Sequence, residues 1–86
     1  MTDTIEAIVN LGKNAPIHHY IIEGETCDGV ECVLSGSYET VGADGNVIKV
    51  FDGDGEIIAF NVDKVSRVNA RTGDVYLNKG TVVTFI

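Results

Sequence analysis

The sequence predicts an all-β fold, a small antiparallel barrel or sandwich of about six to seven short strands, with one short N-terminal helix. Two observations carry this prediction. Val, Ile and Thr supply 28 of the 86 residues and Leu supplies three, and β-branched side chains fit a pleated sheet better than a helix. Asp-Gly pairs, which favour tight hairpin turns, begin at residues 28, 44, 52 and 54. At this length we expect residues 1–86 to form a single domain.

The first twelve residues are the segment that can form a helix. Asp3 and Glu6 have the spacing of a capping box, in which an N-cap side chain and an acid three positions later satisfy backbone amides at the helix start. The apolar residues that follow share one helical face, and Gly12 is a residue type that ends helices. A short strand is the alternative, because Ile and Val dominate the apolar positions.

Residues 17–24 and 30–36 predict the first hairpin. Its register follows from the rule that a slip of one residue moves every side chain to the other face. A two-residue turn would place acidic residues beside apolar ones. A longer loop over residues 25–29 pairs Ile22 with Cys32 and keeps the apolar side chains together, so we expect that register. It also pairs Gly24 with Val30 and Tyr20 with Leu34.

The rest of the chain predicts further short strands separated by turns. They span residues 37–41, 47–51, 56–62, 65–69, 75–78 and 81–86. In the segments 47–51 and 57–60, apolar residues occupy both odd and even positions. This pattern is typical of strands covered on both faces, here by the N-terminal segment or by another subunit.

Charge is distributed unevenly along the chain. The formal net charge is −7. Residues 1–56 hold 11 acids and two bases, a net charge of −9, whereas residues 57–86 hold two acids and four bases, a net charge of +2. Six acids and no Lys or Arg lie between Asn14 and Ile48. An acidic surface of this kind accelerates encounter with a basic protein and repels phosphate backbones, so we expect a basic protein partner and no direct nucleic-acid binding.

The six acids of this stretch are the candidate partner-binding residues. They are Glu23, Glu25, Asp28, Glu31, Glu39 and Asp44, and the first four fall in the predicted first hairpin and its loop. The alternative is that these carboxylates only solvate turns and exposed faces, since a net charge away from zero already favours solubility. A second use of the charge is assembly: if the basic strands lie opposite the acidic hairpins, copies can stack head to tail into a ring.

Cys27 and Cys32, with His18 or His19, are candidate zinc ligands. Adjacent strand residues point to opposite faces, so at most one of the two His residues joins such a site. The expected register separates the two thiols as well, with one at a loop tip and one on the apolar face. We therefore expect neither zinc nor a disulfide, but a buried Cys32 and an exposed Cys27.

Three other groups suggest chemistry weakly. The segment 52–56, Asp-Gly-Asp-Gly-Glu, resembles part of a calcium loop but lacks the EF-hand pattern. His18-His19-Tyr20 suggests acid–base catalysis, yet no nucleophile motif accompanies it. Arg67 and Arg71 with Tyr76 suggest a small anion or base-stacking patch. We expect no catalytic residue, no cofactor and no metal in this protein.

The predicted order of one helix and a meander of short twisted strands resembles the Sm-like and SH3-like small barrels. In size and acidity the chain is also similar to small phage-encoded inhibitors of host defence or nucleases. These considerations lead to a non-enzymatic protein-binding module, including an inhibitor that occupies a nucleic-acid-binding surface. The alternatives are a self-assembling structural subunit and a small metal-binding or nucleic-acid-binding barrel. The absence of a secretory signal and of a long apolar run predicts a cytoplasmic protein, of a cell or of an infected host.

Overall fold

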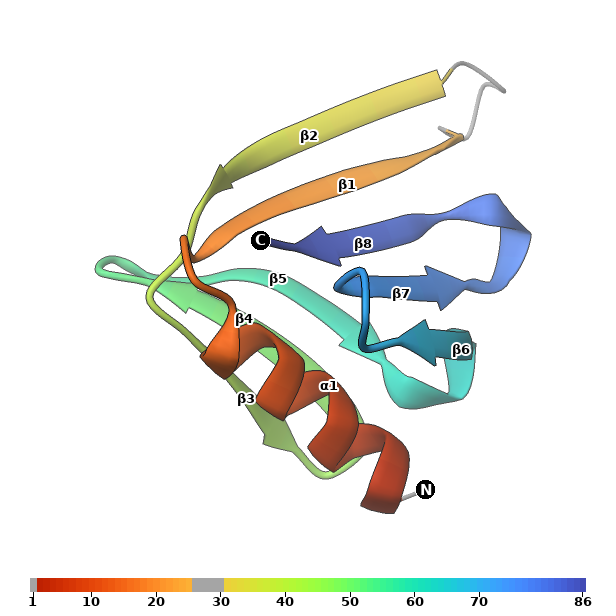
Figure 1. Cartoon of the computed structure of the whole chain (residues 1–86), viewed down its shortest axis with the longest axis horizontal. Coiled ribbons are helices and arrows are strands. Elements are labelled where there is room, and N and C mark those ends of the chain that lie inside the picture. Colours follow the sequence, from red (N-terminus) through yellow and green to blue (C-terminus); the bar gives the residue numbers. More distant parts are fainter. Residues whose placement is uncertain (1, 26–30) are drawn as a thin grey trace.

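The computed structural model describes residues 2–25 and 31–86, which form one helix and eight strands (Figure 1). The elements are α1 (Thr2–Asn14), β1 (His19–Glu25), β2 (Glu31–Ser37), β3 (Thr40–Asp44), β4 (Val47–Asp52), β5 (Gly55–Asn61), η1 (Val62–Lys64), β6 (Val65–Asn69), β7 (Asp74–Leu77), η2 (Asn78–Gly80) and β8 (Val82–Phe85). The predicted all-β class with an N-terminal helix is confirmed. The structure has one strand more than the upper expected number, and the strand predicted over residues 37–41 lies instead at Thr40–Asp44.

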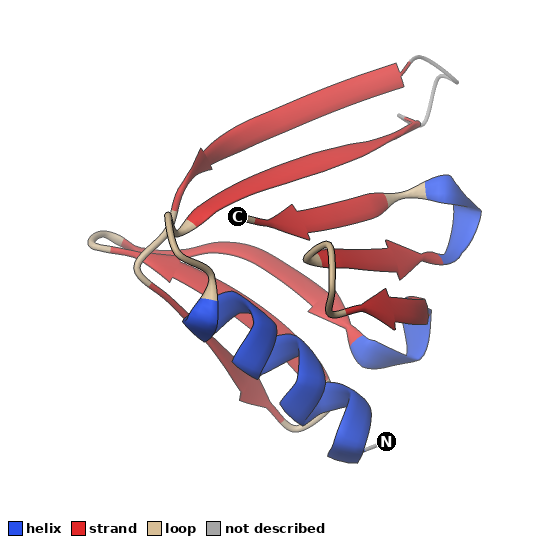
Figure 2. Ribbon diagram, viewed as in Figure 1, coloured by secondary structure: helices blue, strands red, loops and turns tan. Residues whose placement is uncertain are grey.

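The strands form two antiparallel sheets rather than one closed barrel (Figure 2). The five-stranded sheet has the order β2-β1-β8-β7-β6, and the three-stranded sheet has the order β3-β4-β5. The architecture is therefore sandwich-like, and of the two predicted alternatives the sandwich is correct. In this order β2 and β6 occupy the two edges of the larger sheet.

Buried side chains from both sheets and from α1 form one core. They are Ile8, Tyr38, Val41, Ile48, Val50, Val62, Val75, Val83 and Phe85. Within the single chain, the described residues do not bury the segments 47–51 and 57–60 on both faces, and covering by another subunit stays a prediction. In β4 the even positions are buried and the odd ones are only half-buried, while Ile57 in β5 is 36% exposed. On the half-buried face, the Phe51 ring lies next to Gly42 of β3.

The helix prediction is confirmed, but its predicted end at Gly12 is wrong. The helix continues to Asn14, and Gly12 is buried inside it. A Cβ atom at this position would collide with the Val41 side chain of β3. Gly12 is therefore present because the helix backbone approaches the sheet closely, a use of glycine that differs from ending a helix.

The register of the first hairpin has the predicted parity but not the predicted pairs. Ile22 pairs with Leu34, Tyr20 with Gly36 and Gly24 with Cys32. Each partner is thus two positions later than expected, because β1 extends to Glu25 and β2 begins at Glu31. Face alternation fixes odd against even positions and cannot detect a shift of two residues. The Val30 of the expected pairing lies outside the described residues.

Candidate partner-binding surface

The hairpin of β1 and β2 forms one end of the molecule, and it extends away from α1 and the three-stranded sheet (Figure 1). Among the described residues β2 pairs on one side only, with β1, whereas β1 is held between β2 and β8. The side chains of Val33 and Leu34 on β2 are 65% and 56% exposed. Successive residues of a strand face opposite sides, so this edge strand presents an apolar side chain on each of its faces.

The acids of the hairpin lie on one of these two faces. Glu23 is exposed and pairs directly with Val33, and the register places Glu25 directly opposite Glu31. These four positions are all odd-numbered, so they share the face of the sheet that points away from the core. The acidic positions 23, 25 and 31 therefore fall on one face of the hairpin, and this concentration of acidic positions favours a basic partner. Asp28, the fourth predicted residue of the hairpin, lies outside the described residues.

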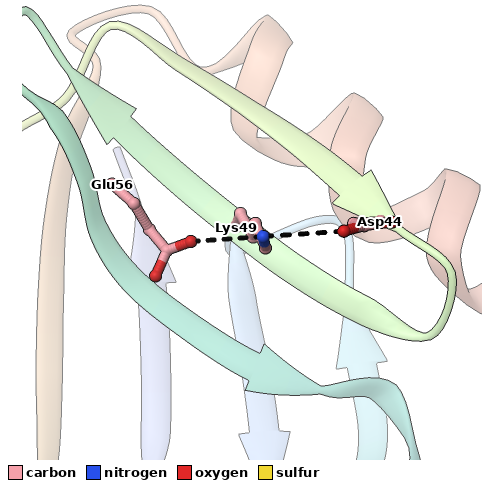
Figure 3. Close-up of polar contacts among 3 residues, drawn as sticks. All are labelled: Asp44, Lys49 and Glu56. Carbon is pink, nitrogen blue, oxygen red and sulfur yellow. Dashed lines mark ion pairs between the residues drawn. The ribbon is translucent and has the colours of Figure 1, made fainter.

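The structure does not bring Glu39 and Asp44 into this cluster. Glu39 follows β2, and its backbone carbonyl accepts a hydrogen bond from the His18 ring. Asp44 ends β3 in the other sheet. There it pairs with Lys49 (Oδ2–Nζ 3.7 Å), which also contacts Glu56 (Oε1–Nζ 3.4 Å), so a cation already lies beside this acid (Figure 3). The predicted set therefore divides into the hairpin acids and two separate residues.

Three of the four basic residues in residues 57–86 lie at or near the other edge of the five-stranded sheet, whereas Lys79 is in η2, between β7 and β8. Lys64 is in η1, Arg67 is in β6, and Arg71 is in the turn between β6 and β7. The charge asymmetry of the sequence thus runs across the sheet, from acids at β2 to bases at β6. The Arg67 guanidinium lies 4.3 Å from the centre of the Tyr76 ring and covers it. This contact occupies one face of the aromatic ring that was predicted to stack on a base.

The His18 ring makes contacts that have a structural role. His18 has a φ of 57° and precedes β1, so the expected strand starts two residues late, at His19. Its ring stacks on Tyr38 at 4.9 Å and contacts the Lys13 and Glu39 carbonyls through Nε2 and Nδ1. These contacts connect the end of α1 with the loop before β3.

The described residues contain no group of three or more His, Cys, Asp or Glu side chains that could hold a metal ion. Cys27 lies outside them. In the loop that resembles a calcium site, the Asp52 side chain accepts hydrogen bonds from the backbone amides of Asp54 (2.7 Å) and Gly55 (3.1 Å). These bonds account for this carboxylate as part of the turn between β4 and β5.

An open groove of 590 Å³, which the sequence analysis did not predict, lies between the end of α1 and the turn that follows β6. Leu11, Pro16 and Phe85 give it an apolar lining, and Arg71 lies at its margin. The lining residues come from three separate parts of the chain, so no local sequence pattern marks them. Exposed apolar residues on β2 were also missed, because Leu34 was expected on a buried face.

Two ionisable groups outside the hairpin have shifted pKa values. Tyr38 is 4% exposed, its hydroxyl donates to the Gly12 carbonyl, and burial raises its pKa. The pKa of Asp74 is lowered, first by the hydrogen bond from Thr84 (2.6 Å) and then by the one from Thr72 (2.7 Å). Both hydroxyls donate to the Asp74 carboxylate and stabilise its charged form. This group connects β7 with β8 and has a structural role.

Asp74→Asn should lower the free energy of unfolding at neutral pH by about 1 kcal/mol, because two hydroxyls lose a charged acceptor at a partly exposed site. The folded-state pKa of Asp74 lies below the unfolded value, so the carboxylate stabilises the fold above the unfolded pKa of about 4. This contribution is lost as the pH falls through the folded pKa. Urea unfolding of both proteins across this range measures the difference.

The control for this prediction is Asp54→Asn, which neutralises an exposed turn residue whose backbone amide, rather than its side chain, makes the local hydrogen bond. It should change the free energy of unfolding by less than about 0.5 kcal/mol at every pH. If the Asp74 and Asp54 variants depend on pH in the same way, the hydroxyls do not stabilise the Asp74 charge.

None of the described helices is both long enough and apolar enough to cross a membrane. No protein-family model matches the sequence, and no similar protein was found among curated sequences or solved structures.

Proposed function

We propose that this protein is a non-enzymatic binding module whose β1–β2 hairpin engages a basic surface of another protein. One observation carries the proposal: in the β1–β2 register, positions 23, 25 and 31, all of them Glu, share a face with the exposed Val33. Acids concentrated near exposed apolar side chains provide both steering and contact area. The segment from Asn14 to Ile48 contains no Lys or Arg, so no basic side chain of this segment can pair with the acids in place of a partner.

The proposal favours a protein over a nucleic acid as the direct partner. Carboxylates repel phosphates, whereas Lys and Arg side chains on a protein gain by pairing with them. A protein surface that itself binds nucleic acid is rich in such side chains. An inhibitor that occupies such a surface is therefore one form of this function.

The test compares two variants that change the net charge equally. The hairpin variant carries Glu23→Gln, Glu25→Gln, Asp28→Asn and Glu31→Gln. The control variant carries Asp3→Asn, Glu6→Gln, Asp54→Asn and Asp63→Asn, on α1, the β4–β5 turn and η1. Binding of fluorescent oligolysine is measured by anisotropy at low and at physiological salt, after circular dichroism has confirmed that both variants are folded.

The hairpin variant should lose at least about tenfold in affinity at low salt, and the control variant about twofold, because only close charges act strongly through a screening solvent. Binding of the natural sequence should weaken as salt is added. Equal losses in the two variants would show that net charge alone attracts the probe and would refute a hairpin site.

A second candidate function, self-assembly, is favoured by the position of acids and bases at opposite edges of the five-stranded sheet. Joining β2 of one copy to β6 of the next would bring opposite charges together in a head-to-tail chain or ring. However, the start of α1 lies alongside β6, because residues of both elements line one groove. This arrangement makes β6 less accessible to a strand of another copy. Light scattering across micromolar concentrations distinguishes a monomer from such an assembly.

A further inference from the structure

The free edge of β2 carries a more specific inference, which rests on the proposed function. We propose that β2 binds its partner by strand addition, and that the partner is an extended segment in which basic and apolar residues alternate. A strand added at β2 extends the order β2-β1-β8-β7-β6 by one, and its backbone pairs with the side of β2 that faces away from β1.

Among residues 2–25 and 31–86, only β1 pairs with β2, so the other side of β2 is available for backbone pairing. An edge strand presents unpaired amides and carbonyls and is a template for another strand. The strand spans Glu31–Ser37 and contains no proline, which would remove an amide donor. At the other edge of the same sheet, α1 lies next to β6. The geometry therefore favours β2 as the docking edge.

The side chains on the two faces of β2 select different residues in an added strand. On the outward face, Val33 and the position of Glu31 lie beside Glu23 and Glu25 of β1. A Lys or Arg on that face of the added strand would neutralise an acidic row. On the other face Leu34 is 56% exposed, although its partner Ile22 is half-buried and pairs in turn with the buried Val83. An apolar side chain on this face would extend the core.

This division explains why the partner sequence should alternate. Directly opposite residues in paired strands share a face, and successive residues switch faces. A segment with the pattern basic, apolar, basic, apolar therefore places every cation beside the acids and every apolar side chain beside Leu34. The same residues in a blocked order place half of each kind on the wrong face.

Charge makes a second copy of this chain a poor occupant of the edge. Pairing β2 with β2 of another copy would join two hairpins that each carry Glu23, Glu25, Asp28 and Glu31. Like charges brought together across an interface oppose binding. A basic segment from a different protein removes this repulsion, so the proposal commits to that occupant.

The experiment uses the full chain and two synthetic peptides of equal composition, one alternating Lys and Val and one with Lys-Lys-Val-Val blocks. Anisotropy gives the affinities, and amide hydrogen exchange by NMR locates the protected residues. The alternating peptide should bind at least about fivefold more tightly than the blocked one and should slow exchange in β2.

The variant Leu34→Ser should bind the alternating peptide about tenfold more weakly, because an apolar contact is lost. Ile17→Ser, which changes an exposed apolar residue outside the hairpin, should leave its affinity within about twofold.

The possible outcomes separate this inference from the proposed function. Equal affinity for both peptides, or unchanged exchange in β2, would overturn strand addition even if oligolysine still binds at the hairpin. Failure of both peptides and of oligolysine would overturn the proposed function as well. Slow exchange in β2 without peptide, together with dimers in sedimentation velocity, would identify a second copy as the occupant and refute the basic segment.

Discussion

Gly73→Ala should lower the free energy of unfolding by about 3 kcal/mol, because two separate costs act at this position. Gly73 has a φ of 83°, a conformation that residues with a Cβ atom rarely adopt. An added Cβ would also collide with the carbonyl oxygen of Phe85 on β8. Movement of Gly73 away from β8 would break the hydrogen bond from the Phe85 amide to the Gly73 carbonyl (2.9 Å).

Gly45→Ala is the matched control, since it has the conformational cost without the collision. Gly45 has a φ of 60°, and an added Cβ there meets nothing within 4 Å. Its expected loss is about 1 kcal/mol. Urea denaturation of both variants measures the difference. Equal losses would mean that the turn before β7 and the β8 backbone are not as close as the structure places them.

Gly12→Ala should lower the free energy of unfolding by about 2 kcal/mol, although helix propensity alone predicts a gain of about 1 kcal/mol. The residue lies within α1, and its Cα faces the buried side chain of Val41 on β3. An added methyl group would force this side chain or the helix to move. The loss therefore measures how tightly α1 is seated on the three-stranded sheet.

A double-mutant cycle with Val41→Ala tests the cause. Val41→Ala removes the methyl groups that an alanine at position 12 would strike, although it leaves a cavity of its own. In that background Gly12→Ala should cost at least about 1 kcal/mol less than in the natural sequence. Additive losses would show that the two positions do not touch and that α1 packs differently.

The fold class followed from local chemistry that the sequence displays directly. β-Branched residues and Asp-Gly turns identified the strands, and the turns at 44–45 and 54–55 fall where Gly45 and Gly55 adopt positive φ. The shift of two residues between β1 and β2 could not be predicted, because both registers keep the same faces together. The role of Gly12 depended on β3, which lies far away in sequence.

The candidate site was predictable in part, for a related reason. Charge counting located the acids of the first hairpin, and the structure places Glu23, Glu25 and Glu31 in neighbouring strands. Counting could not separate these from Asp44, which is close in sequence but pairs with Lys49 in the other sheet. The exposure of Val33 and Leu34 also depends on the strand order, because at the sheet edge only one neighbouring strand covers them.

The most direct test of the proposed hairpin site is a map of amide chemical-shift changes in the ¹⁵N-labelled full chain as oligolysine is added. We expect the largest changes in β1 and β2, within residues 19–25 and 31–37, and small changes in β3, β4 and β5. Shifts of similar size around Asp44, Asp54 and Asp63 would show that the probe follows charge over the whole molecule. That result would contradict a binding site at the hairpin.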